Sequence, residues 1–470
     1  RNGRKQHSPR LTDLALTSGI KPMTTLENSL FKAYDLRGRV PDALNESRAF
    51  AIGCAYVEVI RPRGPVAVGR DMRLSSPGIA SALIDGLQSA GAETVDIGLV
   101  GTEMVYHAAS REGMGGGIMV TASHNPADYN GMKLVRERAI PISGDTGLRD
   151  IEAVVARDGR VSPGSGHGPG RQEDVLDEYV ERLLGHVNAT AIKPLKLVVN
   201  AGNGCAGPAF DALSRALPLD VLRLHHAPDG RFPNGVPNPL LPENRSETAR
   251  AVVEHGADFG VAWDGDYDRC FFFDEAGRFI EGYYLVGLFA ATLLKDRPGE
   301  KIVLDPRLTW NTLDQVAEAG GIALVNKSGH AFIKERMRKE NALYGGEMSA
   351  HHYFRDFAFC DSGMLPWLLL AQTLSGQDRT LGELLDDRIR AYPCSGEINF
   401  SVADTADTIS LVFDHFHGQS PSIDRTDGIS LEFDDWRFNL RASNTEPVIR
   451  LNVETRANPQ LLEDRVGELS

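Results

Sequence analysis

LKLVVNAGNG, Leu195–Gly204, is an apolar, β-branched run that ends in a turn rich in asparagine and glycine. A helical pattern follows it from about Pro208. The same order, a β-branched run, a polar turn and a helical pattern, recurs at Val66–Asp71 (VAVGRD) and at Lys301–Arg307 (KIVLDPR). In the first and third units a second apolar strand follows the helix. Such units build parallel or mixed sheets flanked by helices. Three weakly similar copies predict three related α/β domains in series.

The last part of the chain has a different pattern. From Gly396 onward, short alternating strands are indicated at 398–402, 428–433, 436–440 and 448–453, with one helical stretch between them and another at the end. This is typical of a small α+β domain with an antiparallel sheet. We therefore predict a disordered N-terminal extension at residues 1–25, α/β domains at 26–172, 173–275 and 276–392, and an α+β domain at 393–470.

The amino-acid composition argues against some classes of binding partner. The chain of 470 residues has 50 Lys and Arg against 64 Asp and Glu, a net charge of −14. A chain this acidic and without a basic block is a poor candidate for binding nucleic acid or an anionic membrane surface. No apolar run approaches the roughly 20 residues of a membrane span. The five cysteines are scattered, with no CxxC pair, which indicates reduced thiols in a cytoplasmic protein.

The clearest chemical motif is Asp264–Arg269, DGDYDR, directly after an expected apolar strand at Phe259–Trp263. Three carboxylates at alternate positions can converge on one hard cation. Three ligands that leave room for an external oxygen indicate Mg²⁺ in the service of phosphoryl chemistry. Glu275 falls at the twelfth position of an EF-hand pattern, but the apolar strand at Cys270–Phe273 argues against that site. An acidic surface turn without a metal is the alternative.

Three further segments combine polar side chains with turns. Thr121–Pro126 (TASHNP) follows a buried strand whose end would expose the Ser123 hydroxyl above a sheet, as a nucleophile or simply as a turn-forming serine. Gly345–His352 (GGEMSAHH) offers alternate hydrogen-bonding groups that suit vicinal sugar hydroxyls, although two loop histidines are more often surface residues. Arg441–Pro447 (RASNTEP) could cradle a phosphate or form an ordinary hairpin loop.

In amino-acid sequence and in order along the chain, these four segments resemble the motifs of the α-D-phosphohexomutase superfamily, specifically bacterial phosphomannomutases and phosphoglucomutases. TASHNP resembles the phosphoserine loop, DGDYDR the metal loop, GEMSAHH the sugar loop and RASNTEP the phosphate loop, and Phe31–Gly38 (FKAYDLRG) matches the opening signature. The resemblance covers about residue 30 to the end. It implies three related α/β domains and a small C-terminal domain around a central active-site cleft.

The resemblance also implies residue roles. Ser123 would be phosphorylated in the resting enzyme, and one Mg²⁺ per chain would be held by a phosphoserine oxygen at Ser123 and by Asp264, Asp266 and Asp268. The catalytic residues would be Ser123, His124, Lys133, Arg269 and His330, with Lys133 and His330 as candidate bases. Glu347 and Ser349 would hold the sugar ring. The substrate-binding residues would be Tyr34, Arg37, Arg307, Glu347, Ser349, His351, Arg441, Ser443, Asn444 and Thr445, of which the last four would hold the non-reacting phosphate.

The implied activity is an intramolecular phosphotransferase that interconverts hexose 1-phosphate and hexose 6-phosphate, for mannose and also for glucose. The reaction would pass through a hexose 1,6-bisphosphate, which would also be the activator. The partners would be small hexose phosphates, and the chain a monomer or weak dimer. A phosphoglucosamine mutase would use the same scaffold, but Met348 between Glu347 and Ser349 favours mannose and glucose phosphates. A non-catalytic binding protein is the other alternative, and an intact Ser123 with three aspartates argues against it.

Overall fold

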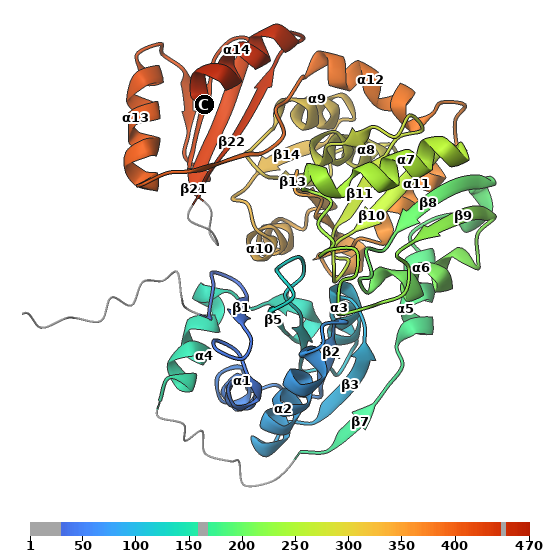
Figure 1. The fold of residues 1–470 in the computed structure, drawn as a ribbon, viewed down its shortest axis with the longest axis vertical. Coiled ribbons are helices and arrows are strands. Elements are labelled where there is room, and N and C mark those ends of the chain that lie inside the picture. Colours follow the sequence, from blue (N-terminus) through green and yellow to red (C-terminus); the bar gives the residue numbers. More distant parts are fainter. Residues whose placement is uncertain (1–29, 158–167, 443–447) are drawn as a thin grey trace, which may run out of the picture.

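The computed structural model describes residues 30–157, 168–442 and 448–470. The predicted extension at 1–25 lies outside these residues, as do Ser443, Asn444 and Thr445. Four sheets follow one another along the chain, three with helices around a mixed sheet and a fourth that is antiparallel (Figure 1). The predicted fold class, three α/β domains followed by a smaller C-terminal domain, is confirmed.

The first domain has a mixed sheet in the order β1-β5-β4-β2-β3-β7, with β6 paired to β5. Along β2, Val66 and Val68 face one core and Ala67 faces the other, as the period of two in a strand requires. The elements are β1 (Leu36–Arg39), α1 (Glu46–Ile60), β2 (Val66–Arg70), α2 (Ser76–Ser89), β3 (Thr94–Leu99), α3 (Thr102–Ser110), β4 (Gly116–Val120), β5 (Tyr129–Arg136), β6 (Ile140–Pro141), α4 (Leu148–Val155) and β7 (Gly170–Gln172).

The second and third domains have five-stranded sheets in the orders β12-β11-β10-β8-β9 and β14-β13-β15-β16-β17. The second comprises α5 (Leu176–Leu184), β8 (Leu195–Asn200), α6 (Ala206–Ser214), β9 (Leu219–Leu224), α7 (Ser246–His255), β10 (Phe259–Trp263), β11 (Cys270–Phe273) and β12 (Phe279–Ile280). The third comprises α8 (Gly282–Leu294), β13 (Lys301–Leu304), α9 (Trp310–Glu318), β14 (Ile322–Val325), α10 (His330–Glu340), β15 (Tyr344–Gly346), β16 (His352–Phe354), β17 (Cys360–Asp361), α11 (Leu365–Ser375) and α12 (Leu381–Ala391).

One strand order repeats through these three sheets. The sets β3-β2-β4-β5, β9-β8-β10-β11 and β14-β13-β15-β16 each contain two parallel pairs and then an antiparallel hairpin. The connection inside each hairpin therefore occupies an equivalent place in its domain. These connections are residues 121–128, 264–269 and 347–351, so the TASHNP, DGDYDR and EMSAH segments are structural equivalents.

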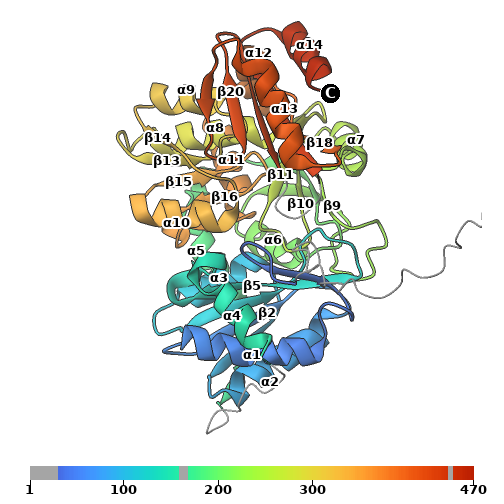
Figure 2. The same cartoon turned by 90° about the vertical axis from the view of Figure 1, so that its left-hand side faces the viewer.

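The fourth domain is an antiparallel sheet in the order β18-β22-β21-β20-β19 with two helices, and it lies against the third domain (Figures 1 and 2). Its predicted strands and helices are found, together with one short edge strand that the pattern did not indicate, β19. The elements are β18 (Ile398–Ser401), α13 (Thr405–His417), β19 (Ser422–Asp424), β20 (Ile429–Glu432), β21 (Trp436–Ala442), β22 (Val448–Thr455) and α14 (Pro459–Leu469).

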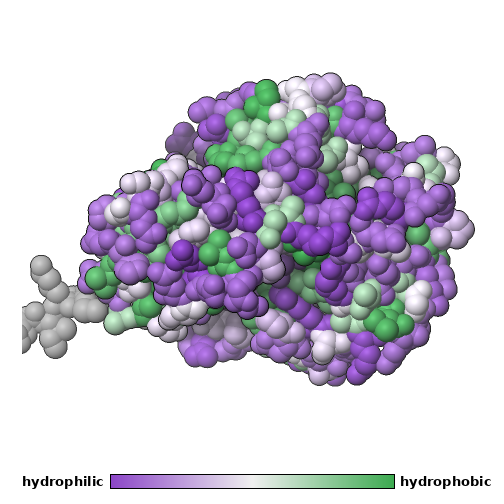
Figure 3. Space-filling view, turned by 90° about the horizontal axis from the view of Figure 1, so that it is seen from above, coloured by the Kyte–Doolittle hydropathy of each residue, from purple (hydrophilic) through white to green (hydrophobic). Residues whose placement is uncertain are grey.

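The apolar cores show which domains are joined. One large cluster runs from α3 of the first domain through α5 and α6 of the second to α8 and α11 of the third. The opposite face of the first sheet, under α1, α2 and α4, has a core of its own, and so does the fourth domain. Seen from the side of the fourth domain, the surface is mainly hydrophilic, with separate apolar patches (Figure 3). No helix among the described residues is long and apolar enough to cross a membrane.

The second sheet extends further along the chain than the sequence pattern indicates. β12 pairs with β11 in an antiparallel hairpin, so Phe279 and Ile280 belong to this sheet although they follow residue 275. The turn between the two strands is closed by Asp274, whose carboxylate accepts bonds from the amides of Ala276 (3.1 Å) and Arg278 (2.8 Å).

Candidate functional site

The three equivalent hairpin connections meet at one place. Ser123 of the first domain donates a hydrogen bond from Oγ to Oδ2 of Asp264 in the second (2.6 Å). Potential ligand atoms of Asp268 in the second domain and of His351 and Asp361 in the third all lie within 4.8 Å of one another. The internal repeat therefore brings together residues that are far apart in the chain.

Ser123 is buried, and its backbone has a positive φ of 50°. Thr121 Oγ1 accepts a hydrogen bond from the Ser123 amide (2.9 Å). The Ser123 carbonyl lies so close to Gly265 that a Cβ at this glycine would be 2.6 Å from it. This close approach explains a glycine between the first two aspartates of the metal loop. Ser123 is thus held from both sides.

Asp264, Asp266 and Asp268 form a buried cluster of carboxylates. One oxygen of each, Oδ1, is buried and has no hydrogen-bond partner among the described residues. Buried carboxylate oxygens are normally satisfied, and three hard oxygen donors on one centre are the ligands that a divalent cation takes. The donor set therefore fits a metal ion such as Mg²⁺.

Two cations balance this cluster. Arg269 donates to Asp264 Oδ2 from Nε (2.9 Å) and from Nη2 (2.7 Å). Lys133, on β5, forms ion pairs with Asp266 (2.7 Å) and Asp268. Burial lowers the pKa of Lys133, but the charges of Asp266 and Asp268 raise it to a net value above the usual range. Lys133 is therefore a cation in this arrangement.

The pKa values of the three histidines are shifted in different directions. Burial, with the charge of Arg269, holds the pKa of His124 well below its usual range, and burial with Lys334 does the same for His330. Neither ring nitrogen of His330 has a hydrogen-bond partner within the described part of the chain. Burial also lowers the pKa of His351, but the nearby Asp268 and Asp361 more than offset it, so the net shift is upward. His330 is therefore a neutral imidazole that can accept a proton.

The opening segment reaches the same place from the first domain. Arg37, on β1, donates from Nη1 to the Asn125 side chain of the TASHNP loop (2.6 Å), and from Nε to Asp35 (2.8 Å). The Tyr34 ring makes an edge contact with the His330 ring, with centroids 4.6 Å apart. Burial raises the pKa of Tyr34, so its hydroxyl stays protonated. This segment links the serine loop to the third domain.

Glu347 in the third domain is buried and fixed by several partners. Its carboxylate accepts hydrogen bonds from Tyr353 Oη (2.5 Å) and from the Gly329 amide (2.8 Å). Arg307 lies beside it, 3.5 Å from Glu347 Oε1 and 3.2 Å from Ser349 Oγ. Glu347, Ser349 and Arg307 thus form one polar surface.

An arginine cluster lies where the fourth domain meets the third. Glu397 is paired with Arg307 (3.4 Å), Arg441 (3.0 Å) and Arg450 (3.2 Å). Burial alone would raise the pKa of Glu397. The three guanidinium groups lower it by more than burial raises it, so the net pKa lies below the usual value and the carboxylate is ionised. Arg307 is also paired with Asp305 (2.9 Å), so Arg441 and Arg450 are the two guanidinium groups that share the Glu397 carboxylate and suit a phosphate.

The described residues of the predicted set are therefore brought together, while Ser443, Asn444 and Thr445 lie outside them. Sequence reasoning missed the buried residues behind the motifs. Asp361 pairs with Lys334 (2.6 Å) and with Nδ1 of His351 (3.1 Å). Neither Lys334 nor Asp361 lies in a pattern of this kind, but an Asp-x-Arg sequence follows the first strand of both the first and third units, at 71–73 and 305–307, and could have indicated Arg73.

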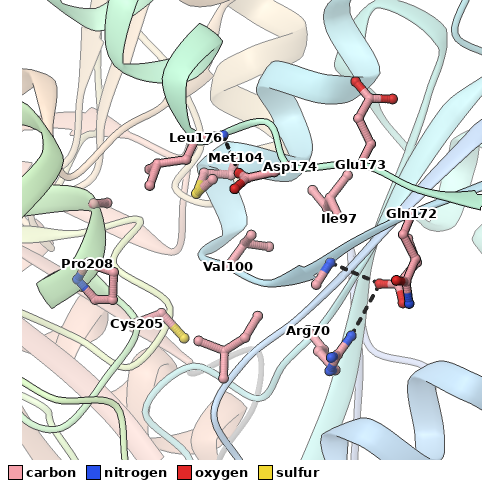
Figure 4. Close-up of a pocket in the computed structure, with 14 residues that line it drawn as sticks. Arg70, Ile97, Val100, Met104, Gln172, Glu173, Asp174, Leu176, Cys205 and Pro208 are labelled. Atoms are coloured by element: carbon pink, nitrogen blue, oxygen red, sulfur yellow. Dashed lines mark hydrogen bonds and ion pairs between the residues drawn. The ribbon is translucent and has the colours of Figure 1, made fainter.

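A separate cavity of about 510 Å³ lies between the first and second domains (Figure 4). Its wall includes Arg70, Met104, Gln172, Leu176 and Cys205, none of which is a predicted site residue. Arg70 is occupied by an ion pair with Asp96 (3.2 Å). This cavity is distinct from the place where the three hairpin connections meet.

Comparison with known proteins covers nearly the whole chain. Residues 28–162, 177–277 and 281–392 match alpha/beta/alpha domains I, II and III of the phosphoglucomutase/phosphomannomutase family, and residues 397–469 match its C-terminal domain. The chain is 59% identical to a protein of Xanthomonas campestris pv. campestris named phosphohexose mutases, over 94% of this chain and 98% of that one. It is 56% identical to an Escherichia coli phosphomannomutase, over 93% and 97%.

Among solved structures, the fold is similar to that of a phosphoglucomutase/phosphomannomutase family protein from Burkholderia thailandensis. The TM-score is 0.83 at 34% sequence identity, over 95% of this chain and 97% of that one.

Proposed function

Because the chain belongs to the phosphoglucomutase/phosphomannomutase family, we propose that it is a hexose phosphate mutase that accepts mannose phosphate and also glucose phosphate. The observation that carries the proposal is the hydrogen bond of Ser123 Oγ to Asp264 (2.6 Å), beside three buried carboxylate oxygens without partners among the described residues. A hydroxyl next to a cation-binding cluster is the arrangement that phosphoryl transfer needs.

In the proposed reaction, the resting enzyme carries a phosphoryl group on Ser123. A free sugar hydroxyl, at C6 or C1, attacks phosphorus, the bond from phosphorus to Ser123 Oγ breaks, and a hexose 1,6-bisphosphate forms. The hydroxyl proton passes to the neutral His330 imidazole, and Ser123 Oγ leaves beside Arg269, whose Nη2 lies 3.5 Å away. The bisphosphate then turns over, and its other phosphoryl group returns to Ser123 by the reverse step.

Asp264, Asp266 and Asp268 would hold Mg²⁺, which when bound supplies positive charge to the transferring phosphoryl oxygens. Positioning and charge neutralisation do most of the work in such transfers. Arg269 and Lys133 add two fixed positive charges, and His124 lies against Arg269. The cluster of Arg307, Arg441 and Arg450 would hold the phosphate that does not react.

Sugar specificity follows from the polar surface of the third domain. We assign Glu347 and Ser349 to the O3 and O4 hydroxyls, which mannose and glucose share, and no residue to O2, where they differ. Where no residue hydrogen-bonds a hydroxyl, the kcat/KM values of two substrates that differ there differ by on the order of 10²-fold or less. Where a residue does hydrogen-bond it, the difference is about 10⁴-fold or more. Mannose and glucose 1-phosphates should therefore be turned over with kcat/KM values within about two orders of magnitude.

The test is a coupled assay with the 1-phosphates of mannose, glucose, galactose and glucosamine, in the presence of hexose 1,6-bisphosphate. Galactose 1-phosphate, inverted at O4, should be the poor substrate. Ser123→Ala should remain folded, lose nearly all turnover and no longer gain the mass of one phosphate. Wild-type turnover by Ser123→Ala would contradict the proposed carrier. A clear preference for glucosamine phosphate would identify the other mutase activity instead.

A further inference from the structure

We propose that Arg73 is a positioning residue for phosphoryl transfer, because its guanidinium fixes the backbone of the loop that carries Ser123. The inference rests on the proposed function for its consequence in catalysis. The geometry itself does not depend on that function. Arg73 lies outside the four motifs, in the turn after β2.

The Arg73 guanidinium donates several hydrogen bonds to the serine loop, residues 121–128, and to the residue after it. Its Nη1 donates to the carbonyls of Pro126 (2.6 Å) and Tyr129 (2.9 Å). Its Nη2 donates to the carbonyls of Ser123 (2.9 Å) and Asn125 (2.6 Å). The side chain is 0% exposed. Three carbonyls of the loop and that of Tyr129, at the start of β5, thus accept hydrogen bonds from a single buried group.

Arg73 is itself held firmly. Asp71 Oδ1 accepts a hydrogen bond from the Arg73 amide (3.0 Å) and one from Ser76 Oγ (2.5 Å), and Asp71 Oδ2 lies 3.3 Å from Arg73 Nε. On the other side, the Phe232 ring of the second domain lies 5.2 Å from the guanidinium carbon. The Arg73 guanidinium is therefore held in one position and gives the serine loop a fixed support.

The loop needs such a support because Ser123 has a left-handed backbone conformation, with a φ of 50°. A non-glycine residue keeps this conformation only where its surroundings determine it. Thr121 Oγ1 accepts a hydrogen bond from the Ser123 amide, and Arg73 donates one to the Ser123 carbonyl. Without Arg73, four carbonyls between Ser123 and Tyr129 would lose this donor, among them the buried carbonyl of Ser123, and Ser123 Oγ would no longer be directed at Asp264.

The internal repeat supports this role. Arg307 of the third domain stands at the same place, two residues after the aspartate that follows β13, and it reaches Glu347 and Ser349 of that domain's hairpin connection. In the second domain the turn after β8 carries no arginine, and the Cys205 amide donates to the Gly265 carbonyl instead (2.9 Å). Each domain thus fixes its loop from the turn after its first parallel strand.

A lysine cannot replace this arginine, because it offers three donors on one nitrogen and lacks the planar fork that spans four carbonyls. The Arg73 guanidinium donates to backbone carbonyls, that of Ser123 among them, so its loss should change catalysis more than binding. A misplacement of about 1 Å can cost on the order of 10²-fold in rate. We therefore expect Arg73→Lys to lower kcat by about 10²-fold with KM nearly unchanged.

The experiment compares Arg73→Lys and Arg73→Ala with wild type in the full chain. The readouts are kcat and KM, the rate at which Ser123 gains phosphate from glucose 1,6-bisphosphate, followed by intact mass, and the hydrogen exchange of residues 121–129. Exchange in this segment should rise and phosphorylation should slow. Millimolar guanidinium chloride, but not sodium chloride, should restore part of the Arg73→Ala rate, since the ion can enter the space left behind.

Arg245 provides a matched control. It donates to the carbonyls of Pro239 (2.9 Å) and Leu240 (2.6 Å) and lies over the Phe279 ring (3.6 Å), outside the site. Arg245→Lys should keep wild-type kcat and wild-type exchange at 121–129. A folded Arg73→Lys with wild-type exchange and kcat would overturn the proposal, as would equal losses in both variants. If wild type itself lacks mutase activity, the proposed function fails, and exchange still decides whether Arg73 orders the loop.

Discussion

At the scale of single residues, the carboxylate of Asp266 shows how the site is balanced. Its Oδ2 accepts hydrogen bonds from Thr102 Oγ1 (2.5 Å) and Lys133 Nζ (2.7 Å), both from the first domain. Its Oδ1 has no partner among the residues that the structure describes. One oxygen thus docks the metal loop on the first domain while the other remains available to a cation.

Asp266→Asn should therefore weaken Mg²⁺ activation by at least about 10-fold and lower kcat, because it removes one of three negative charges from the site. The measurement is activity against Mg²⁺ concentration after treatment with EDTA. Asp274→Asn is the control, since Asp274 is a buried carboxylate of the same domain that binds the β11–β12 turn and Arg278. Full activity of exhaustively chelated wild type would contradict the metal assignment.

The pH dependence should distinguish the two candidate bases, Lys133 and His330. A histidine or lysine acts as a base only in its unprotonated, neutral form. The pKa of His330 in the folded protein is well below 6.5. The value of kcat/KM should therefore stay constant as pH falls through 6.5 and decline only at lower pH. His330→Gln should lose this acidic limb and most of the rate. Lys133→Ala should lower the rate by a factor that is uniform in pH, because Lys133 is already a cation.

His107→Gln is a control for this profile, because His107 is also buried and burial lowers its pKa, to about 4. It should leave the profile unchanged. A Lys133→Ala profile that loses the acidic limb, with a wild-type profile in His330→Gln, would transfer the role of the base to Lys133.

At the scale of elements, helix α3 connects all three α/β domains. Thr102 at its start binds Asp266 of the second domain. Glu103 Oε1 accepts hydrogen bonds from the amides of Gly363 (3.2 Å) and Met364 (3.1 Å), just before α11 of the third. Tyr106, one turn later, presents its ring to Lys334 Nζ at 3.8 Å. Three residues on one helix thus fix the two neighbouring domains.

This contact should make stability depend on pH through Glu103. Burial raises the pKa of Glu103 to about 8, so the folded state holds a proton that the unfolded state releases above its ordinary pKa of 4.5. The free energy of unfolding should therefore fall as pH rises from about 5 to 8, by at most about 1.4 kcal/mol per pH unit. Glu103→Gln should flatten this dependence in denaturant titrations at several pH values. An unchanged slope would show that Glu103 is not the group responsible.

At the scale of the whole molecule, the cores divide the chain unequally. The first three domains share one continuous apolar cluster, whereas the fourth has its own and meets the third through charged side chains such as Glu397 and Arg307. Glu397 is central to this junction, because it pairs with Arg307 of the third domain and with Arg441 and Arg450 of the fourth. A junction of charges over a shared anion site suits a domain that closes on its substrate.

Glu397→Gln should therefore lower Tm by a few degrees without ligand, because Arg441 and Arg450 lose the carboxylate that they share, whereas Arg307 keeps Asp305. Inorganic phosphate should then raise Tm more in this variant than in wild type, since the anion replaces the missing charge. Glu300→Gln is the control, since Glu300 pairs with the single Arg355 (2.9 Å) within the third domain. Equal stabilisation of wild type and Glu397→Gln by phosphate would contradict the assignment.

The sequence by itself determined the local elements and the residue types of the site. β10 and β11 match the predicted strands residue for residue, because strand and turn patterns are local. Ser123, the three aspartates, Glu347 and Arg441 were found because they lie inside short motifs. The β11–β12 hairpin and the edge strand β19 were missed, since two- and three-residue strands carry too little periodicity.

Only the tertiary structure decided which distant groups serve those motifs. Arg73 lies 50 residues before Ser123, and Glu397 lies 90 residues after Arg307, yet each pair is in contact. Lys334 and Asp361 meet through the packing of α10 against the third sheet. No local pattern records such contacts, because they depend on how the repeated domains pack. A buried charge is stable there only when its partner arrives from elsewhere in the fold.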